Sequence, residues 1–328
     1  MTGLLRNLSF WLFLTALLLV VLALTIPKLS YSQRFFHHIH VFDVTQSMNV
    51  EDVNFKEEKI RRIELAKQTS RTALEAMPCG SKLGYAIFTE HRSFLLLAPV
   101  EVCDNYTELL KILNTIDWQI AWRSRSEIAK GLNSANKVAM SLKKPARVIF
   151  FTDGHESPPV HPQLRFIPEA VQPEYQGVIV GVGGNTATVI PRFDLSGKKL
   201  GYWRAEDVSQ VDVYSRGRPV TGSESMMGAA AMLSTGQEHL SYLHEDYLKR
   251  LAEESAMAYY PLTTVKRAAK YITQSQWGEL QVAKGDIRWL LASFALMILT
   301  LVYSLRFFKN LLYKLRNHRI VSGKQPVR

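Results

Sequence analysis

Cysteine is scarce in this sequence, with 2 residues in 328, which excludes a disulfide-rich scaffold. Signatures of serine hydrolases and nucleotide-binding proteins are missing as well. There is no G-x-S-x-G elbow, and Gly181-Val-Gly-Gly184 is followed by neither a P-loop lysine nor a Rossmann spacing. Hydrophobic residues make up 47 % and charged residues 21 % of the chain, which is typical of a folded protein.

Acidic residues are fewer than basic ones, 29 against 40, which gives a net charge of +11 with histidine neutral. The excess is concentrated at the C-terminus, because residues 306–328 contain seven lysines and arginines and no acid. A basic segment beside an apolar run is more typical of a membrane topology signal than of a nucleic-acid-binding arm.

Two apolar runs are long enough to suggest membrane spans. Leu8 to Ile26 is uncharged over 19 residues, and Trp289 to Leu305 over 17, extendable through Phe307 and Phe308. A helix needs about 20 apolar residues to cross the hydrocarbon core. The alternatives are a cleaved signal peptide for the first run, although it is long and lacks an A-x-A site, and a buried core helix for the second.

The basic tail predicts that the C-terminus is cytoplasmic, and two spans return the N-terminus to the same side. We therefore expect a double-pass inner-membrane protein of a bacterium with both termini in the cytoplasm. The expected parts are an N-terminal stub, span and linker (1–34), a periplasmic domain (35–284), a second span (285–308) and a basic tail (309–328).

Both cysteines, Cys79 and Cys103, fall in the segment expected outside the cytoplasm, where an oxidising environment permits a disulfide. They flank the strands predicted at 82–88 and 93–97. If these strands form a hairpin, the two cysteines are close enough for a bridge. The alternative is a pair of small buried thiols.

Strand and helix patterns alternate between the two apolar runs. Strands are expected at 37–42, 82–88, 93–97, 147–151, 177–182 and 257–262. Helical stripes run through 60–77, 109–113, 128–142 and 247–256. This order predicts an α/β fold with a mostly parallel sheet and helices on both faces. Residues 184–241 interrupt the pattern and are expected to form an insertion, with a turn at Asp194-Leu-Ser-Gly197 between short strands.

Oxygen-bearing side chains follow several of these strands. Asp43, Thr45 and Ser47 come after the first strand, Asp153 follows the 147–151 strand, and Ser126 precedes the helix at 128. Ligands bind beyond the carboxyl ends of strands in such sheets, and hard cations prefer oxygen ligands. The sequence predicts that one divalent cation binds at this edge. Mg²⁺ is the preferred ion, and Ca²⁺ and Mn²⁺ are the alternatives. The alternative, without a metal, is that these side chains cap helices and turns.

The pattern Asp43-Val-Thr-Gln-Ser47, a later hydroxyl loop and Thr152-Asp153-Gly154 resembles the metal-ion-dependent adhesion site (MIDAS) of von Willebrand factor A (VWA) domains. The resemblance covers roughly residues 37–262 and implies a Rossmann-like VWA fold. It also implies that the hydroxyls of Thr45, Ser47 and Ser126 bind the metal. The third loop departs from the family, because Trp122-Arg-Ser-Arg125 replaces its glycines, and Ser124 is an alternative ligand to Ser126.

A closer resemblance is to bacterial VWA proteins held by flanking membrane helices. The stretch from Asp43 to Asp52 is similar to that of aerotolerance (Bat) proteins, as are residues 190–197 and 247–252. Methanol-oxidation accessory proteins of the MxaL/MxaC type share this architecture, and the Thr-Gln in the motif and the long insertion are more similar to them. This resemblance implies a role in maturing periplasmic methanol dehydrogenase, including the loading of its calcium.

We therefore expect a binding module, not an enzyme, whose metal recruits an acidic residue of a periplasmic or membrane partner protein and not a nucleic acid. The alternative is a Bat-type envelope scaffold whose domain does not bridge a partner through metal. His155 and Glu156 are the only candidate general bases beside the motif. His37, His38 and His40 suggest either a second metal site or packing at a strand end.

Overall fold

The computed structural model describes residues 2–25, 29–121, 125–157, 165–194, 196–208, 239–286 and 288–322. The chain divides into two compact units. One is formed by residues 34–279, and the other combines residues 1–33 with residues 280–328.

The larger unit is built on a six-stranded sheet in the order β13-β8-β7-β2-β5-β6. Its strands are β2 (His37–Asp43), β5 (Lys82–Thr89), β6 (Arg92–Glu101), β7 (Arg147–Thr152), β8 (Val178–Gly181) and β13 (Ala258–Pro261). All neighbours pair in parallel except β5 and β6, which form an antiparallel hairpin. The predicted α/β class with a mostly parallel sheet is confirmed, and each predicted strand is present.

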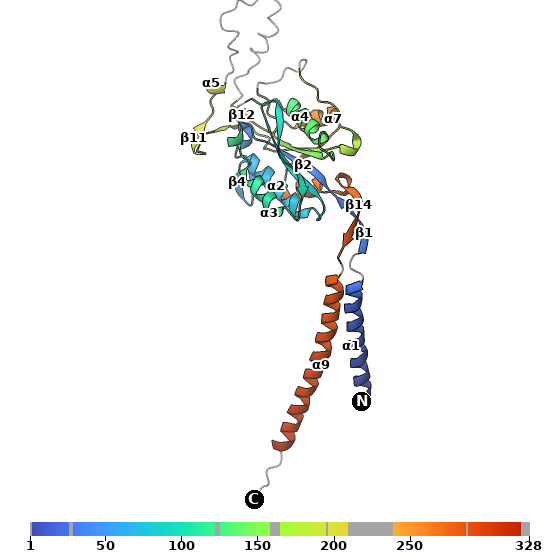
Figure 1. Cartoon of the computed structure of the whole chain (residues 1–328). Coiled ribbons are helices and arrows are strands. Elements are labelled where there is room, and N and C mark those ends of the chain that lie inside the picture. The colour runs from blue at the N-terminus through green and yellow to red at the C-terminus, as the bar shows by residue number, and fades with distance from the viewer. Residues whose placement is uncertain are drawn as a thin grey trace, which may run out of the picture. The chain divides into compact units, whose positions relative to one another are not determined.

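Helices cover both faces of this sheet (Figure 1). The helices α2 (Arg62–Ala76), α3 (Tyr106–Thr115) and α8 (Val265–Ile272) pack on one face, in a core that includes Phe42 and Phe151. The helices α4 (Ile128–Met140) and α7 (Glu245–Glu254) pack on the other, around Val41 and Phe150. Alternate residues of a strand point to opposite faces, so β2 and β7 contribute to both cores. The β7 strand is apolar along most of its length, whereas β2 also carries histidines.

Several elements were not predicted. They include the α8 helix and the ribbon of β3 (Val53–Phe55) with β4 (Glu58–Ile60). Short 3-10 turns lie at Gln46–Asn49 (η1), Trp118–Ile120 (η2), Pro173–Tyr175 (η3) and Ser275–Trp277 (η4).

The described parts of the predicted insertion contain short strands, as expected. β10 (Pro191–Phe193) pairs with β11 (Lys199–Tyr202), and β9 (Thr188–Val189) pairs with β12 (Leu240–Ser241). The turn predicted at Asp194 joins β10 to β11, and the Gly197 amide donates to the Asp194 carbonyl at 2.9 Å. A four-residue helix, α5 (Ala205–Val208), follows. Residues 209–238 of the insertion lie outside the described residues.

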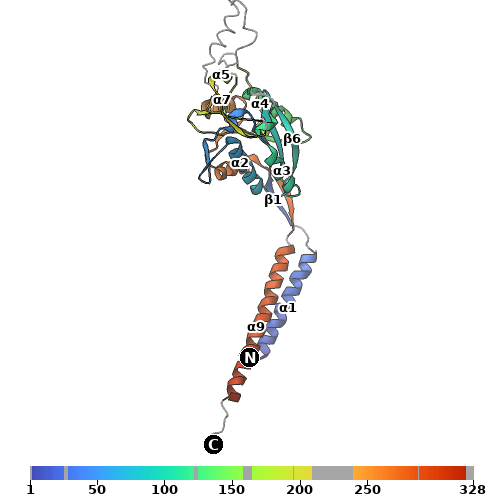
Figure 2. The ribbon, with the colours of Figure 1, turned by 90° about the vertical axis from the view of Figure 1, so that its left-hand side faces the viewer.

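The smaller unit contains two long helices, α1 (Thr2–Thr25) and α9 (Arg288–Ser322), and a ribbon of β1 (Leu29–Phe35) and β14 (Glu279–Gly285). The helices run side by side in opposite directions (Figure 1 and Figure 2). Phe13 meets Tyr303 with ring centroids 6.1 Å apart, and Ala16 and Ala295 are buried. Small residues let apolar helices approach each other closely.

Within the described residues, one helix is long and apolar enough to cross a membrane, over Arg288–Phe308 of α9. This agrees with the second predicted span. The first predicted span corresponds to α1, whose apolar stretch, Phe10–Thr25, is shorter. A double-pass topology therefore stays a prediction. The α9 helix continues through the basic tail as far as Ser322.

Cys79 and Cys103 form a disulfide with their Cα atoms 5.3 Å apart. The hairpin explains this proximity, because the first residue of β5, Lys82, pairs with the last residue of β6, Glu101. The bridge closes a separation of 24 residues and ties the connection after α2 to the end of the edge strand.

Of the three histidines of β2, His38 and His40 lie in the core and His37 is half-buried. The described residues contain no group of three or more His, Cys, Asp or Glu side chains placed to hold a metal. His38 and His40 are fully buried on the α2 and α8 face. His40 Nδ1 lies 2.7 Å from the Ser70 hydroxyl, and His38 Nε2 lies 3.2 Å from the Trp277 carbonyl oxygen. Their surroundings match the packing interpretation.

Candidate metal centre

The first loop of the candidate site begins where β2 ends. Asp43 is fully buried, and its Oδ1 accepts hydrogen bonds from the Thr45 amide at 3.0 Å and the Thr45 hydroxyl at 2.6 Å. The Thr45 and Ser47 hydroxyl oxygens lie 3.3 Å apart. The loop therefore gathers one carboxylate and two hydroxyls at the carboxyl end of a central strand.

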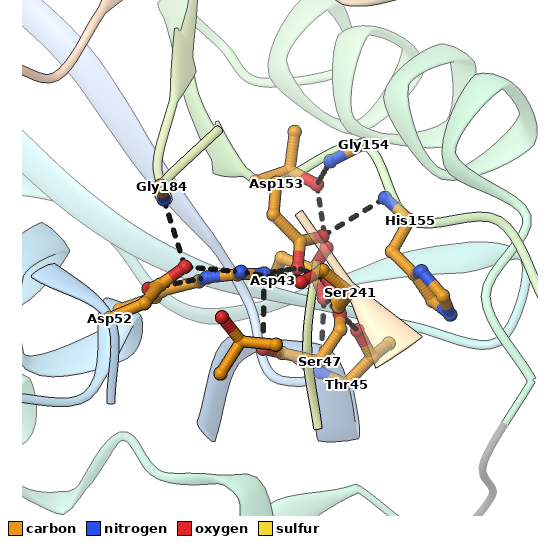
Figure 3. A network of polar contacts seen from close by, with 12 residues as sticks. Asp43, Thr45, Ser47, Asp52, Asp153, Gly154, His155, Gly184 and Ser241 are labelled. Atoms are coloured by element: carbon orange, nitrogen blue, oxygen red, sulfur yellow. Dashed lines mark hydrogen bonds and ion pairs between the residues drawn. The ribbon is translucent and has the colours of Figure 1, made fainter. Parts of the chain in front are cut away.

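The second loop follows the neighbouring strand, β7. Thr152 donates its hydroxyl to Asp43 Oδ2 at 2.7 Å, which ties the two loops together. Asp153 is fully buried, and its Oδ1 accepts from the His155 amide at 3.0 Å. The carboxylates of Asp43 and Asp153 gather with Thr45 and Ser47 at one edge of the sheet (Figure 3). The adjacency of β2 and β7 produces this meeting, as the sequence predicted.

The third predicted loop reaches the same edge. Ser126 forms isolated β-bridges with Glu90, just after β5, and with Ser157, after β7. In the sheet, β2 lies between β5 and β7. The two bridges therefore place Ser126 across the end of β2, where Asp43 lies. The Ser126 hydroxyl is buried and has no hydrogen-bond partner within the described part of the chain. The alternative ligand, Ser124, lies outside the described residues.

The two carboxylates have opposite pKa shifts. Burial, followed by the nearby charge of Asp153, raises the pKa of Asp43 to about 7. Burial also acts to raise the pKa of Asp153, but the charges of Arg62 and His155 outweigh it, so this pKa lies below its usual range. A buried carboxylate beside a second one favours the approach of a cation.

Sequence reasoning missed Arg62, the first residue of α2, whose side chain is fully buried beside this site. Its guanidinium donates to Asp153 Oδ2 at 2.6 Å and to the Ser241 hydroxyl at 2.7 Å. It also forms a bidentate pair with Asp52, at 2.9 and 2.6 Å. These partners lie far apart in the sequence. Asp52 and Asp153 were noticed as parts of motifs, whereas Ser241 was not.

Two glycines make room for this arginine. A Cβ atom on Gly183 would lie 2.9 Å from Arg62 Nε, and Gly183 has a φ of +145°. The Gly184 amide donates to Asp52 Oδ2 at 2.9 Å. The Gly-Gly pair of the notable Gly181-Val-Gly-Gly184 segment therefore accommodates the arginine and its carboxylate partner.

The oxygen set fits a hard cation. Thr45 donates its hydrogen to Asp43 and Ser47 donates to Asp153, so the lone pairs of both hydroxyls remain available. Mg²⁺ binds oxygens at about 2.1 Å, which separates neighbouring octahedral ligands by about 3.0 Å. The 3.3 Å between the two hydroxyl oxygens is close to this value.

The capping interpretation explains only part of these contacts. Asp43 and Asp153 each accept an amide two residues ahead, as turn-closing aspartates do. The η1 turn, however, has no side-chain hydrogen bond at its N-cap, Thr45. Among the described residues, no group of three or more His, Cys, Asp or Glu side chains is placed to hold a metal, so a centre here depends on hydroxyls.

Of the two candidate general bases, Glu156 is engaged by α7. Burial raises the pKa of Glu156 to about 7, and its Oε1 accepts from the Tyr247 hydroxyl at 2.5 Å. The His155 ring lies near the His244 ring, with centroids 5.8 Å apart.

Residues 39–155, which include the loops of Asp43 and Asp153, match the family model of the von Willebrand factor type A domain. The chain contains a VWA domain. The α/β VWA fold expected from the motif is thus confirmed. A comparison with curated proteins gave no match.

Several solved structures are similar to this chain. BatB from Bacteroides thetaiotaomicron is 18 % identical, with a TM-score of 0.46, and the match covers 73 % of this chain and 96 % of BatB. An aerotolerance-related membrane protein from Bacteroides fragilis is 17 % identical, with a TM-score of 0.46 and coverages of 74 % and 98 %. A membrane-spanning protein from Vibrio fischeri is 17 % identical, with a TM-score of 0.27 and coverages of 72 % and 96 %.

Proposed function

We propose that the VWA domain binds one divalent cation and uses it to hold an acidic residue of a partner protein. Mg²⁺ is the preferred ion, and its ligands are Asp43, Thr45, Ser47, Ser126 and Asp153. The observation that supports this most directly is the pair of hydroxyl oxygens of Thr45 and Ser47, 3.3 Å apart with their hydrogens directed at carboxylates. Such a pair offers two neighbouring ligands to an octahedral ion.

Charge supports an acidic partner. Of the two carboxylates, Asp153 already shares a hydrogen bond and an ion pair with Arg62. The remaining ligands are neutral hydroxyls, so the bound cation retains excess positive charge. A carboxylate from another protein neutralises this charge and completes the coordination shell.

The proposed setting is the bacterial inner membrane, with the VWA domain in the periplasm and both termini in the cytoplasm. The apolar α9 helix and the disulfide between Cys79 and Cys103 support this placement, because disulfides persist outside the reducing cytoplasm. Protease protection in spheroplasts tests it, since only residues between α1 and α9 should be cleaved from outside.

Within this setting, we propose an accessory role in maturing a periplasmic enzyme, methanol dehydrogenase in the first instance, including its calcium insertion. The support is the sequence resemblance to MxaL/MxaC-type proteins in the Thr-Gln of the metal motif and in the long insertion. The alternative is a Bat-type envelope scaffold, supported by the resemblance of residues 43–52. A scaffold needs no metal bridge, so metal dependence separates the two.

We propose binding and not catalysis for this site. The Glu156 carboxyl accepts the Tyr247 hydroxyl and the Ala129 amide, contacts that anchor the loop to α7 and α4. Hydrolysis of a model ester or phosphate that is lost in Asp153→Asn would instead indicate an enzyme.

The test uses the full chain in detergent and purified calcium-free methanol dehydrogenase. We expect the enzyme to co-purify with the chain in Mg²⁺ and to dissociate in EDTA. Ser47→Ala should abolish capture, whereas Ser141→Ala, which removes an exposed hydroxyl at the end of α4, should not. Capture by Ser47→Ala at full strength would disprove the metal bridge, and capture that persists in EDTA would favour the scaffold.

A further inference from the structure

A hollow of about 930 Å³ lies beside the β10–β11 hairpin, and its wall includes Arg192, Leu200, Tyr202, Trp203 and His239. The strands that flank it lie at one end of the VWA domain, near β12 and α5 (Figure 1). We propose that this hairpin hollow binds an acidic peptide segment of a partner protein, at a site separate from the metal centre and independent of metal.

Two residues that line the hollow, Trp203 and His239, each carry a ring nitrogen without a partner among the described residues. Trp203 Nε1 and His239 Nδ1 are buried, and neither has a hydrogen-bond partner in the described part of the chain. An indole N–H can only donate, and leaving it buried without an acceptor costs about 1–3 kcal/mol. A carboxylate oxygen in the hollow satisfies this donor once the ring edge turns outward, and it also favours the histidine tautomer that carries its hydrogen on Nδ1.

The charge in the hollow also selects a carboxylate. The Arg192 guanidinium lies over the Trp203 ring at 4.9 Å from the centroid. Among the described residues it has no ion pair or hydrogen bond. Stacking on an aromatic face leaves the edge of a guanidinium free for bidentate carboxylate recognition. Among the described residues that line the hollow, the basic side chains are Arg192 and Arg204 and the acidic one is Asp207.

Apolar side chains accompany these polar groups. Leu200 and Tyr202 are 58 % and 54 % exposed, and both line the hollow. Exposed apolar groups beside charged ones are typical of contact surfaces for proteins. The occupant is therefore a peptide segment with acidic residues next to apolar ones, and not an isolated inorganic anion.

The hairpin is tied to the loop that follows the metal-binding residues. Lys199 forms an ion pair with Glu51 at 3.1 Å, and the Phe193 ring stacks on Trp118 at 5.7 Å. Glu51 adjoins Asp52, the partner of Arg62. The hollow is therefore attached to the edge of the VWA domain that bears the proposed metal centre.

The test follows indole N–H resonances of the ¹⁵N-tryptophan-labelled full chain in detergent and EDTA. The probe is a capped peptide of alternating glutamate and leucine, with the glutamine counterpart as its control. We expect the Trp203 resonance, assigned by its loss in Trp203→Phe, to shift saturably with the acidic peptide alone. Arg192→Gln should weaken binding by about tenfold or more, as expected for a lost charge-assisted pair.

A control variant and the metal-free buffer sharpen this result. Arg267→Gln, which removes an exposed arginine on α8, should bind the peptide as the unmodified chain does. Because the titration is run in EDTA, saturable binding there also shows that the hollow does not use the metal. An unmoved Trp203 resonance or equal binding by Arg192→Gln would each overturn the proposal. Neither outcome affects the metal-bridge proposal.

Discussion

The guanidinium of Arg62 donates to Asp153 Oδ2 at 2.6 Å, and both side chains are fully buried. The same guanidinium holds Asp52 and Ser241, so one side chain joins the loop after the metal motif, the loop after β7 and the end of the insertion. Through this contact, Arg62 fixes the orientation of Asp153, a predicted metal ligand.

Replacement of Arg62 by methionine should destabilise the domain strongly. The change leaves Asp52 and Asp153 buried without their counter-charge, and removing one partner of a buried pair costs about 3–5 kcal/mol. The neighbouring Arg61→Met is the control, because its ion pair with Asp117 is partly exposed and should contribute about 1 kcal/mol or less. Urea unfolding in EDTA measures both losses, and equal losses would contradict the role assigned to Arg62.

The buried histidine His38 predicts a loss of stability in acid. Burial lowers its pKa from 6.5 to about 4. Above pH 6.5 it is neutral in both states, and its full contribution to stability is present. Between pH 6.5 and 4 the unfolded chain binds a proton that the folded chain does not. The free energy of unfolding should therefore fall by about 1.4 kcal/mol per pH unit, about 3 kcal/mol in total.

Denaturant unfolding of the chain and of His38→Phe, from pH 7.5 to 4.5, isolates this effect as the difference between the two. The phenylalanine keeps a ring beside Phe36 but cannot bind a proton. We expect the difference to change with pH by the slope above. A pH-independent difference for His38→Phe would show that this histidine does not govern the acid loss.

The disulfide should stabilise the VWA domain by restricting its unfolded state. A bridge across 24 residues is worth about 3 kcal/mol in the chain-entropy model. The double variant Cys79→Ser/Cys103→Ser should unfold at correspondingly lower urea, and a reductant should lower the midpoint of the unmodified chain but not of the variant. Free thiols on the untreated protein, detected by alkylation, would show that the bridge does not form.

Most helices and strands around the central sheet could be predicted, because the spacing of apolar residues within each segment determines them. The stripe through Ile63, Ala66 and Ala73 repeats at helical spacing and forms the buried face of α2. The β7 strand is continuous in apolar residues because it lies between two helical layers. The α8 helix was missed, since residues 265–272 mix lysine and arginine with alanine and show their apolar face only against α2.

The site was predictable where its residues follow strands, and not where its contacts join distant segments. Asp43 and Asp153 meet because β2 and β7 are neighbours, which the motif implied. Arg62 has the sequence signature of an exposed charge in the first turn of a helix. Its burial depends on Asp52, Asp153 and Ser241, 10, 91 and 179 residues away. Only the folded arrangement reveals that network.

A Mn²⁺ titration followed by electron paramagnetic resonance determines whether Asp43, Ser47 and Asp153 share one cation. The full chain in detergent, stripped with EDTA, should bind one Mn²⁺ that excess Mg²⁺ displaces. Asp43→Ala and Ser47→Ala should lose this ion while keeping a cooperative unfolding transition, and Ser141→Ala should retain it. Undiminished Mn²⁺ binding by both site variants, or no bound Mn²⁺ in the unmodified chain, would contradict the proposal that these residues share a cation.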